Sequence, residues 1–180
     1  MKNMPIQPIS QTMWDEILQI QAEAYSEIEP ESLEVLQSKW QQSPACCFAY
    51  LEEKRELEEQ SGPEDKEEAQ GILGYLLAHA WHSETPPKLY QTLPEGSHGS
   101  ILFLHDLALS KRAAGRGVGS QMVKHLLETA TLLGFNSVLL VSVQDSVPFW
   151  QKHGFDEVVS QQASDSYGED AKIMRRVLVY

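Results

Sequence analysis

The strongest constraint on the fold is an apolar segment that runs into a glycine-rich turn and then into a helical pattern. Residues 100–110, SILFLHDLALS, are apolar except at their ends and at two inner positions, which is typical of a strand covered on both faces. Residues 110–120, SKRAAGRGVGS, contain three glycines, and an apolar stripe of helical spacing follows over 117–133, with Gly134 after it. A strand, a glycine-rich turn and a helix in this order offer backbone N–H groups and a positive helix end to a phosphate group.

The charge around this turn favours the same ligand. From Leu107 to Leu127 the chain has four basic side chains and no acidic one, although the whole chain carries a formal net charge of −12 at pH 7. Such a stretch concentrates an anion at the turn, and the missing Cβ atoms of its glycines let the anion reach the backbone. The alternative is a glycine-rich turn that only connects two elements.

Two common nucleotide motifs do not fit the turn. A P-loop for nucleoside triphosphates requires a lysine directly before its serine or threonine, whereas Gly119 stands directly before Ser120. The glycines are spaced G-x-G-x-G rather than G-x-G-x-x-G, and no early strand–helix–strand unit surrounds them. The pattern therefore disfavours both triphosphate hydrolysis and dinucleotide binding.

The bulk composition indicates one globular domain over residues 1–180. The longest mainly apolar run, residues 71–81, is shorter than the roughly 20 residues of a membrane helix, and residues 1–10 have no apolar leader core. A cytoplasmic protein without a membrane partner is predicted, and the adjacent Cys46 and Cys47, which lack metal-binding spacing, are predicted to be free thiols with no metal site. The negative charge argues against a nucleic-acid partner.

The remaining patterns predict an α/β fold, a mixed sheet with helices on both faces. The predicted elements are a helix (13–25), a helix (32–41, capped by Ser32), strands (45–52, 71–81 and 100–110), a helix (117–133), a strand (136–143), a short helix through Trp150 and two strands (around 155–161 and 171–180). A Glu-rich segment at about 52–70 is predicted to be a solvated hairpin loop. From Leu51 to Gln70 it has nine acidic and three basic residues, half of the net charge, so the acidity says little about the substrate.

Two segments resemble signatures of the GNAT superfamily of N-acetyltransferases. Residues 107–127, LALSKRAAGRGVGSQMVKHLL, resemble its pyrophosphate-binding segment [QR]-x-x-G-x-[GA], and residues 146–155, SVPFWQKHGF, resemble its aromatic-x-K-x-G-F signature. In the register with the best flanking match Ala114 stands at the Gln/Arg position, and a register that starts at Arg112 also satisfies the motif. The resemblance implies a central mixed, mostly antiparallel sheet and acetyl-CoA or a related acyl-CoA as cosubstrate. The residues it places against the acyl-CoA are Leu107, Ala108, Leu109, Ala114, Gly115, Arg116, Gly117, Val118, Gly119 and Ser120.

Within the superfamily the chain is most similar to the arylalkylamine (serotonin) N-acetyltransferase branch. That branch has histidines on the strand that matches FLHDLAL, and a V-P-F-Y-x-x-x-G-F segment. His105 matches one of these histidines, and Phe103 stands where the other would be. Residues 22–36, AEAYSEIEPESLEVL, resemble the branch's mobile acceptor-binding loop and the helix after it. Tyr25 and Phe103 are therefore candidate acceptor contacts.

His105 is the candidate catalytic base. An amine attacks a thioester only when it is uncharged, and a histidine titrates near neutral pH. A buried strand histidine satisfied by hydrogen bonds is the alternative, against which the family resemblance weighs. Strand alternation points Asp106, the second candidate, to the opposite face.

Trp150 stands where many relatives carry a tyrosine that protonates the departing CoA thiolate. An indole N–H donates a hydrogen bond but does not release its proton. Trp150 is therefore predicted to orient or stabilise the thiolate, while water or the hydroxyl of Ser142, Ser146 or Tyr167 supplies the proton. A tryptophan packed in the core is the alternative.

The sequence thus predicts an acyl-CoA-dependent N-acetyltransferase that transfers an acetyl group directly to a primary amine, most simply a small amine. Three carboxylates on the segment before the second helix, those of Glu27, Glu29 and Glu31, suit an ammonium-bearing acceptor, although a solvated acidic loop would look the same. Two alternatives stay open, a protein N-terminal or lysine acetyltransferase and an inactive acyl-CoA-binding sensor.

Overall fold

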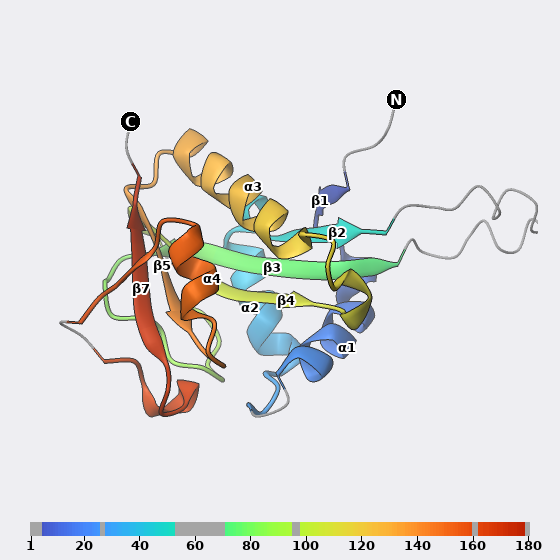
Figure 1. Cartoon of the computed structure of the whole chain (residues 1–180), viewed down its shortest axis with the longest axis horizontal. Helices are drawn as coiled ribbons and strands as arrows, with labels where there is room; N and C mark the ends of the chain where they lie inside the picture. The colour runs from blue at the N-terminus through green and yellow to red at the C-terminus, as the bar shows by residue number, and fades with distance from the viewer. Residues whose placement is uncertain (1–4, 26–27, 53–70, 95–97, 160–161, 179–180) are drawn as a thin grey trace, which may run out of the picture.

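The computed structural model of the chain describes residues 5–25, 28–52, 71–94, 98–159 and 162–178. Glu27 and nearly all of the predicted acidic loop lie outside these residues. Within the described ranges, seven strands form one sheet in the order β1-β2-β3-β4-β5-β7-β6 (Figure 1). The strands are β1 (Ile6–Pro8), β2 (Phe48–Leu51), β3 (Ile72–Trp81), β4 (Ile101–Leu109), β5 (Ser137–Ser142), β6 (Asp156–Glu157) and β7 (Lys172–Val177). Neighbours are antiparallel except β4 and β5, which are parallel, so the predicted mixed, mostly antiparallel sheet is confirmed.

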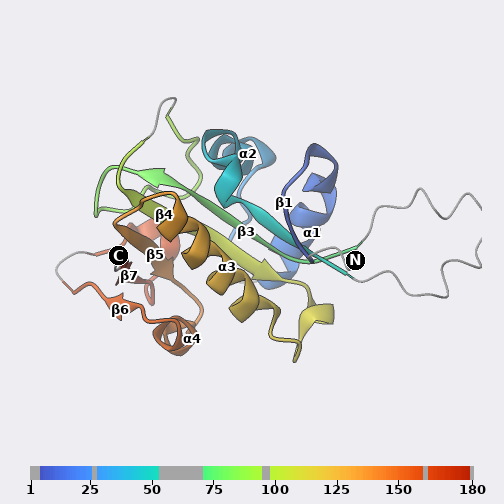
Figure 2. The same ribbon diagram turned by 90° about the horizontal axis from the view of Figure 1, so that it is seen from above.

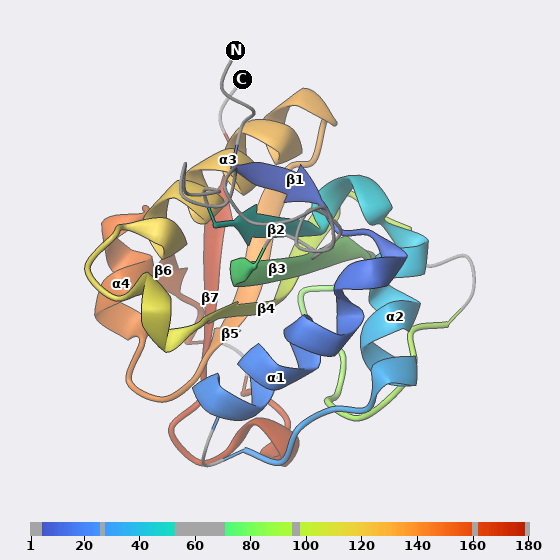
Figure 3. The same cartoon turned by 90° about the vertical axis from the view of Figure 1, so that its right-hand side faces the viewer.

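Helices cover both faces of this sheet (Figure 3). The helices are α1 (Trp14–Ala24), α2 (Leu33–Gln42), α3 (Val118–Leu132) and α4 (Val147–Lys152). Apolar side chains of α3, such as Met122 and Leu126, pack in one core with Leu76 and Leu104 of the sheet. A second core joins α1 and α2 to the other face of the sheet. Figure 2 shows α3 lying across the sheet, and none of the described helices is long and apolar enough to cross a membrane.

Two local signals in the sequence are confirmed at helix ends. The Oγ of Ser32 accepts a hydrogen bond of 3.3 Å from the backbone N–H of Val35, so Ser32 caps α2. Gly134 has a φ of +84° directly after the last turn of α3, the left-handed conformation that glycine adopts at this position.

The sheet edges differ from the sequence predictions. Pro44 starts a 3-10 turn that ends at Cys46, so the strand predicted over 45–52 is only β2. The edge strand β1 was not predicted, because it is three residues long and ends in a proline. The C-terminal strands are shorter than predicted, β6 having two residues and β7 six.

The parallel pair β4 and β5 separates along its length. Pairing joins Ile101–Leu104 to Ser137–Leu140 and stops there, whereas β4 continues to Leu109. The backbone of β4 beyond Leu104 therefore has β3 on one side and no strand on the other.

Candidate active site

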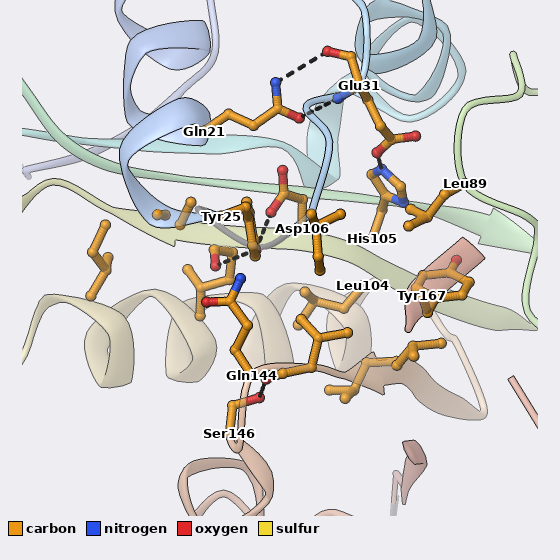
Figure 4. Close-up of a pocket in the computed structure, with 18 of the residues that line it drawn as sticks. Gln21, Tyr25, Glu31, Leu89, Leu104, His105, Asp106, Gln144, Ser146 and Tyr167 are labelled. Carbon is orange, nitrogen blue, oxygen red and sulfur yellow. Dashed lines mark hydrogen bonds and ion pairs between the residues drawn. The ribbon is translucent and has the colours of Figure 1, made fainter. Parts of the chain in front are cut away.

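A cavity of about 470 Å³ lies where β4 and β5 stop pairing. Its walls include residues 104–109 of β4, Leu140 and Val141 of β5, Gly119 of α3, Phe149 and Trp150 of α4, and Gln21, Tyr25 and Glu31 in and after α1. Figure 4 shows the polar side chains around it, with His105, Asp106 and Tyr25 on one side and Gln144 and Ser146 across from them. The cavity thus joins the two segments that carry the sequence signatures, β4 with the start of α3 and α4.

A bulge in β4 places both polar residues of this strand on one side of the sheet. The register with β3 pairs Leu77 with Asp106 and Ala78 with Leu104, which leaves His105 without a partner on β3. Because a bulge shifts the alternation of side chains by one residue, His105 and Asp106 both point toward the α1–α2 side, as Figure 4 shows. The prediction that Asp106 faces away from His105 is therefore wrong.

His105 is held by Glu31, which lies just before α2. The imidazole Nε2 is 2.5 Å from Oε1 of Glu31, and the two side chains are 1% and 7% exposed. Burial alone raises the pKa of Glu31, but the charge and hydrogen bond of His105 and the charge of Lys39 outweigh burial and lower this pKa to about 2. Glu31 is therefore an ionised carboxylate already engaged by protein groups, and not the free ligand for an acceptor ammonium that the sequence suggested.

Asp106 is occupied by two tyrosines. The hydroxyl of Tyr25 donates to Oδ1 at 2.5 Å, and that of Tyr75 donates to Oδ2 at 2.6 Å. Burial raises the pKa of Asp106, and the charge of His105 and the two tyrosine hydrogen bonds offset only part of this effect. Tyr25, a predicted acceptor contact, thus lines the cavity with its hydroxyl bound to Asp106. Both oxygens of Asp106 accept hydrogen bonds, whereas only one nitrogen of His105 has a partner among the described residues, so His105 is the better candidate base.

The glycine-rich turn presents backbone N–H groups at the start of α3. Gly115 and Gly117 have φ values of +76° and +68°, in the left-handed region that glycine adopts at little cost. The first backbone hydrogen bond of α3 runs from the N–H of Gln121 to the carbonyl of Gly117. The N–H groups of residues 118–120 therefore have no carbonyl partner within the helix, and such an end attracts phosphate groups.

Gly119 lies where this turn meets the cavity. A Cβ atom at this position would lie 3.3 Å from Cδ1 of Leu109 and 3.5 Å from Cζ of Phe149. A side chain at this position would press on Leu109 and Phe149 in the cavity wall, so glycine leaves the most space beside the start of α3.

The predicted basic cluster is divided between two surfaces. Arg112 donates to Oε2 of Glu52 at 2.8 Å and to the carbonyl of Ile72 at 3.1 Å, so it is bound at the β2–β3 end. Lys111 and Arg116 remain exposed near the turn. A further contact at the turn joins the Oγ of Ser120 to Nε2 of His153 at 3.2 Å.

Trp150 is both a core residue and part of the cavity wall. Its side chain is 7% exposed and packs edge-on against Phe149 and Phe155. The indole Nε1–H donates to the Oγ of Ser146 at 3.2 Å, and that hydroxyl lies 2.9 Å from the Oγ of Ser142. The third predicted hydroxyl, that of Tyr167, donates to the carbonyl of Pro87 at 2.6 Å. Of the three hydroxyls, Ser146 is the one bound to the indole.

Phe103, a predicted acceptor contact, is not among the described residues that line the cavity. It is fully buried and packs with Leu139 and Ile173 in a third cluster. Phe103 precedes the bulge, in the part of β4 that is paired on both sides. Its partners are His79 of β3 and Leu139 of β5. Its ring centroid lies 6.3 Å from that of His105, which makes it a packing neighbour of the base candidate.

Comparisons with known proteins agree with this architecture. Residues 14–155 match the model of the acetyltransferase (GNAT) family. Among solved structures, Ard1 from Thermoplasma volcanium is 18% identical over 97% of both chains, with a TM-score of 0.67. The NatC complex bound to Gag peptide and CoA is 13% identical over 97% of this chain and 98% of that one, with a TM-score of 0.66. The loading GNATL domain of CurA from Lyngbya majuscula is 12% identical over 96% of both chains, with a TM-score of 0.71.

A separated strand pair beside a glycine-rich helix start suits a ligand that carries phosphate groups. Because the family model covers most of the chain, the protein belongs to the GNAT acetyltransferase family and is an acyl-CoA-dependent N-acetyltransferase. The predicted fold and enzyme class are confirmed. No curated protein sequence matches the chain, and the comparisons do not single out the arylalkylamine branch.

Proposed function

We propose that this N-acetyltransferase moves an acetyl group from acetyl-CoA directly to the primary amine of a small molecule. The observation that carries this proposal is the charge of the cavity. Its described lining residues include no lysine or arginine, and beside the engaged carboxylates of Glu31 and Asp106 they include the exposed carboxylate of Glu29. Such a wall attracts an ammonium group and disfavours an acidic acceptor. Apolar lining residues such as Ile28 and Leu89 suit an apolar body attached to the amine.

The acyl-CoA would be held by the turn and by the free side of β4. The N–H groups of residues 118–120 would bind the diphosphate, and the backbone of residues 107–109, which line the cavity, would run beside the pantetheine. The bound acyl-CoA supplies the thioester. This arrangement would bring the thioester between Trp150 and His105.

The transfer needs one proton acceptor and no covalent enzyme intermediate. His105 takes a proton from the ammonium group, and the freed amine attacks the thioester carbonyl. The C–N bond forms and the C–S bond breaks. The attacking nitrogen loses its second proton, the CoA thiolate takes one up, and the amide and the CoA thiol leave. Neither cysteine is among the described lining residues, and burial raises the pKa of Cys46 to about 11 and that of Cys47 to about 12, so neither thiol is poised as a nucleophile.

In this proposal Trp150 and Ser146 lie beside the departing CoA thiolate and stabilise it. Because the indole N–H is bound to Ser146, it offers no proton of its own. Replacing Trp150 with tyrosine places a hydroxyl with a pKa near 10 in the same wall. We expect the Trp150→Tyr variant to raise turnover about tenfold, less than the roughly 10²–10⁴-fold that a fully positioned general acid supplies, as measured by thiol release at saturating acetyl-CoA. A lower turnover with unchanged acetyl-CoA binding would show that the indole itself is needed.

The acceptor proposal is tested with a panel of purified substrates. Thiol release from acetyl-CoA is measured with arylalkylamines, alkylamines, polyamines, acidic amino acids and peptides with free N-termini. We expect the amines without a carboxylate to give the highest kcat/KM. Peptides are the second candidate, because Ard1 and the NatC complex have the same fold. A panel in which only peptides react would replace the small-amine proposal by protein N-terminal acetylation.

A further inference from the structure

We propose that Glu31 is a positioning residue that fixes His105 in the tautomer with the proton on Nε2, so that Nδ1 is the nitrogen that receives the acceptor's proton. This inference rests on the proposed role of His105 as base. It names the atom of His105 that reacts, and it gives Glu31, 74 residues away in the chain, a part in the reaction.

The chemistry of the two partners fixes the tautomer. An ionised carboxylate has only acceptor oxygens, whereas a neutral imidazole has one N–H donor and one acceptor nitrogen. At 2.5 Å from Oε1 of Glu31, Nε2 of His105 must therefore carry the hydrogen. The backbone N–H of Tyr90 and the charge of Lys39 also favour the ionised form of Glu31, so its carboxylate remains an acceptor beside a neutral His105.

Glu31 itself has no freedom to turn away. Its second oxygen, Oε2, accepts a hydrogen bond of 2.9 Å from the backbone N–H of Tyr90 and lies 3.9 Å from Nζ of the buried Lys39. The side-chain amide of Gln21 pairs with the Glu31 backbone, donating to its carbonyl and accepting from its N–H, both at 3.1 Å. Groups from α1, α2 and the segment after β3 thus hold the carboxylate against His105, as Figure 4 shows for Gln21 and Glu31.

The other imidazole nitrogen is not engaged by the described protein groups, and the ring is 1% exposed beside the cavity. Nδ1 of His105 is buried and has no hydrogen-bond partner among the described residues, and His105 belongs to the cavity wall. Buried polar atoms without partners are uncommon in native proteins and point to a function. With Nε2–H bound to Glu31, the lone pair of a neutral His105 is on Nδ1. When Nδ1 takes the proton, the carboxylate stabilises the resulting imidazolium.

The substitution Glu31→Gln tests this arrangement because it reverses the hydrogen bond. The amide oxygen of a glutamine is required on the side of Tyr90 N–H and Lys39, both of which are donors. Its NH₂ group then faces His105 and donates to Nε2. His105 is thereby forced into the Nδ1–H tautomer, which has no lone pair on the nitrogen that should act as base.

The experiment combines spectroscopy with kinetics. Two-bond ¹H–¹⁵N correlation spectra of histidine-labelled protein, recorded without acceptor over a pH series and assigned with His105→Ala, report the tautomer of the neutral ring. We expect the Nε2–H tautomer in the wild type and the Nδ1–H tautomer in Glu31→Gln. In this variant kcat should fall by about 10²-fold or more, with an acceptor KM within about threefold of the wild type. An enzyme whose catalytic histidine is in the wrong tautomer loses up to about 10⁴-fold in kcat. The matched control Glu34→Gln removes the same charge from an exposed position in the first turn of α2 and should change neither readout.

Two results would overturn the inference. One is a wild-type spectrum that shows Nδ1–H, which decides the matter even if Glu31→Gln does not fold. The other is a folded Glu31→Gln enzyme with kcat within threefold of the wild type. The spectra need no acceptor, so a panel in which no amine reacts would defeat the proposed function and leave the tautomer to be judged separately.

Discussion

Replacing His105 with alanine is expected to lower kcat for acetyl transfer by about 10²–10⁴-fold while acetyl-CoA still binds. The magnitude is that of a positioned general base. The acceptor reaches the enzyme as an ammonium ion, and without a base its proton has to leave by chance encounter with water. His105 is suited to this task because it belongs to the cavity wall and Glu31 holds its ring. The measurement is thiol release at saturating concentrations of both substrates.

Two comparisons make this result specific. His82→Ala changes an exposed histidine that packs on Trp81 and should retain the wild-type rate. Stabilisation of the His105→Ala variant by acetyl-CoA in a thermal-shift titration should equal that of the wild type, because His105 is remote from the glycine-rich turn in the proposed complex. If His105→Ala keeps more than a tenth of the wild-type kcat and Asp106→Asn does not, the base is Asp106.

The elements around the site were predictable because their patterns are local. The apolar run of β4, the stripe of α3 and the glycines between them are read directly from neighbouring residues, and the structure places them as predicted. The Ser32 cap and Gly134 are likewise decided within one helical turn. Strand β1 could not be found in this way, because three residues give no pattern and its pairing with β2 depends on the rest of the sheet.

The chemistry of the site was less predictable because it depends on contacts that are distant in sequence. Alternation along β4 is a sound rule for a regular strand, and only the register against β3 reveals the bulge that brings Asp106 to the side of His105. The partnership of Glu31 with His105 spans 74 residues. The sequence offered Glu31 only as one of several acidic residues before α2. Phe103 was misplaced for the same reason, since closure of β5 over its part of β4 is a property of the sheet.

The second large effect is expected from a substitution in the glycine-rich turn, at Gly117. The matched control is the same substitution at Gly134, at the other end of α3. Gly117 and Gly134 flank the helix with φ values of +68° and +84°, and a Cβ at Gly117 would approach only Nε2 of Gln121, at 3.9 Å, while one at Gly134 has nothing within 4 Å. Valine at either position costs about 1–2 kcal/mol of backbone strain, so both variants should be destabilised alike. Only Gly117 lies where the diphosphate of the acyl-CoA is proposed to bind.

The Gly117→Val variant is expected to bind acetyl-CoA about 10²-fold more weakly, whereas Gly134→Val should bind it as the wild type does. Relief of the strain at Gly117 re-aims the N–H groups of residues 118–120, and the loss of two hydrogen bonds to a charged ligand amounts to roughly 3 kcal/mol. At a ligand concentration of about 100 times the wild-type Kd, stabilisation by acetyl-CoA would fall from about 2.7 to about 0.4 kcal/mol. Equal stabilisation of the two variants in a thermal-shift titration would mean that the turn only connects β4 to α3, because strain is matched between them and position is the one difference left.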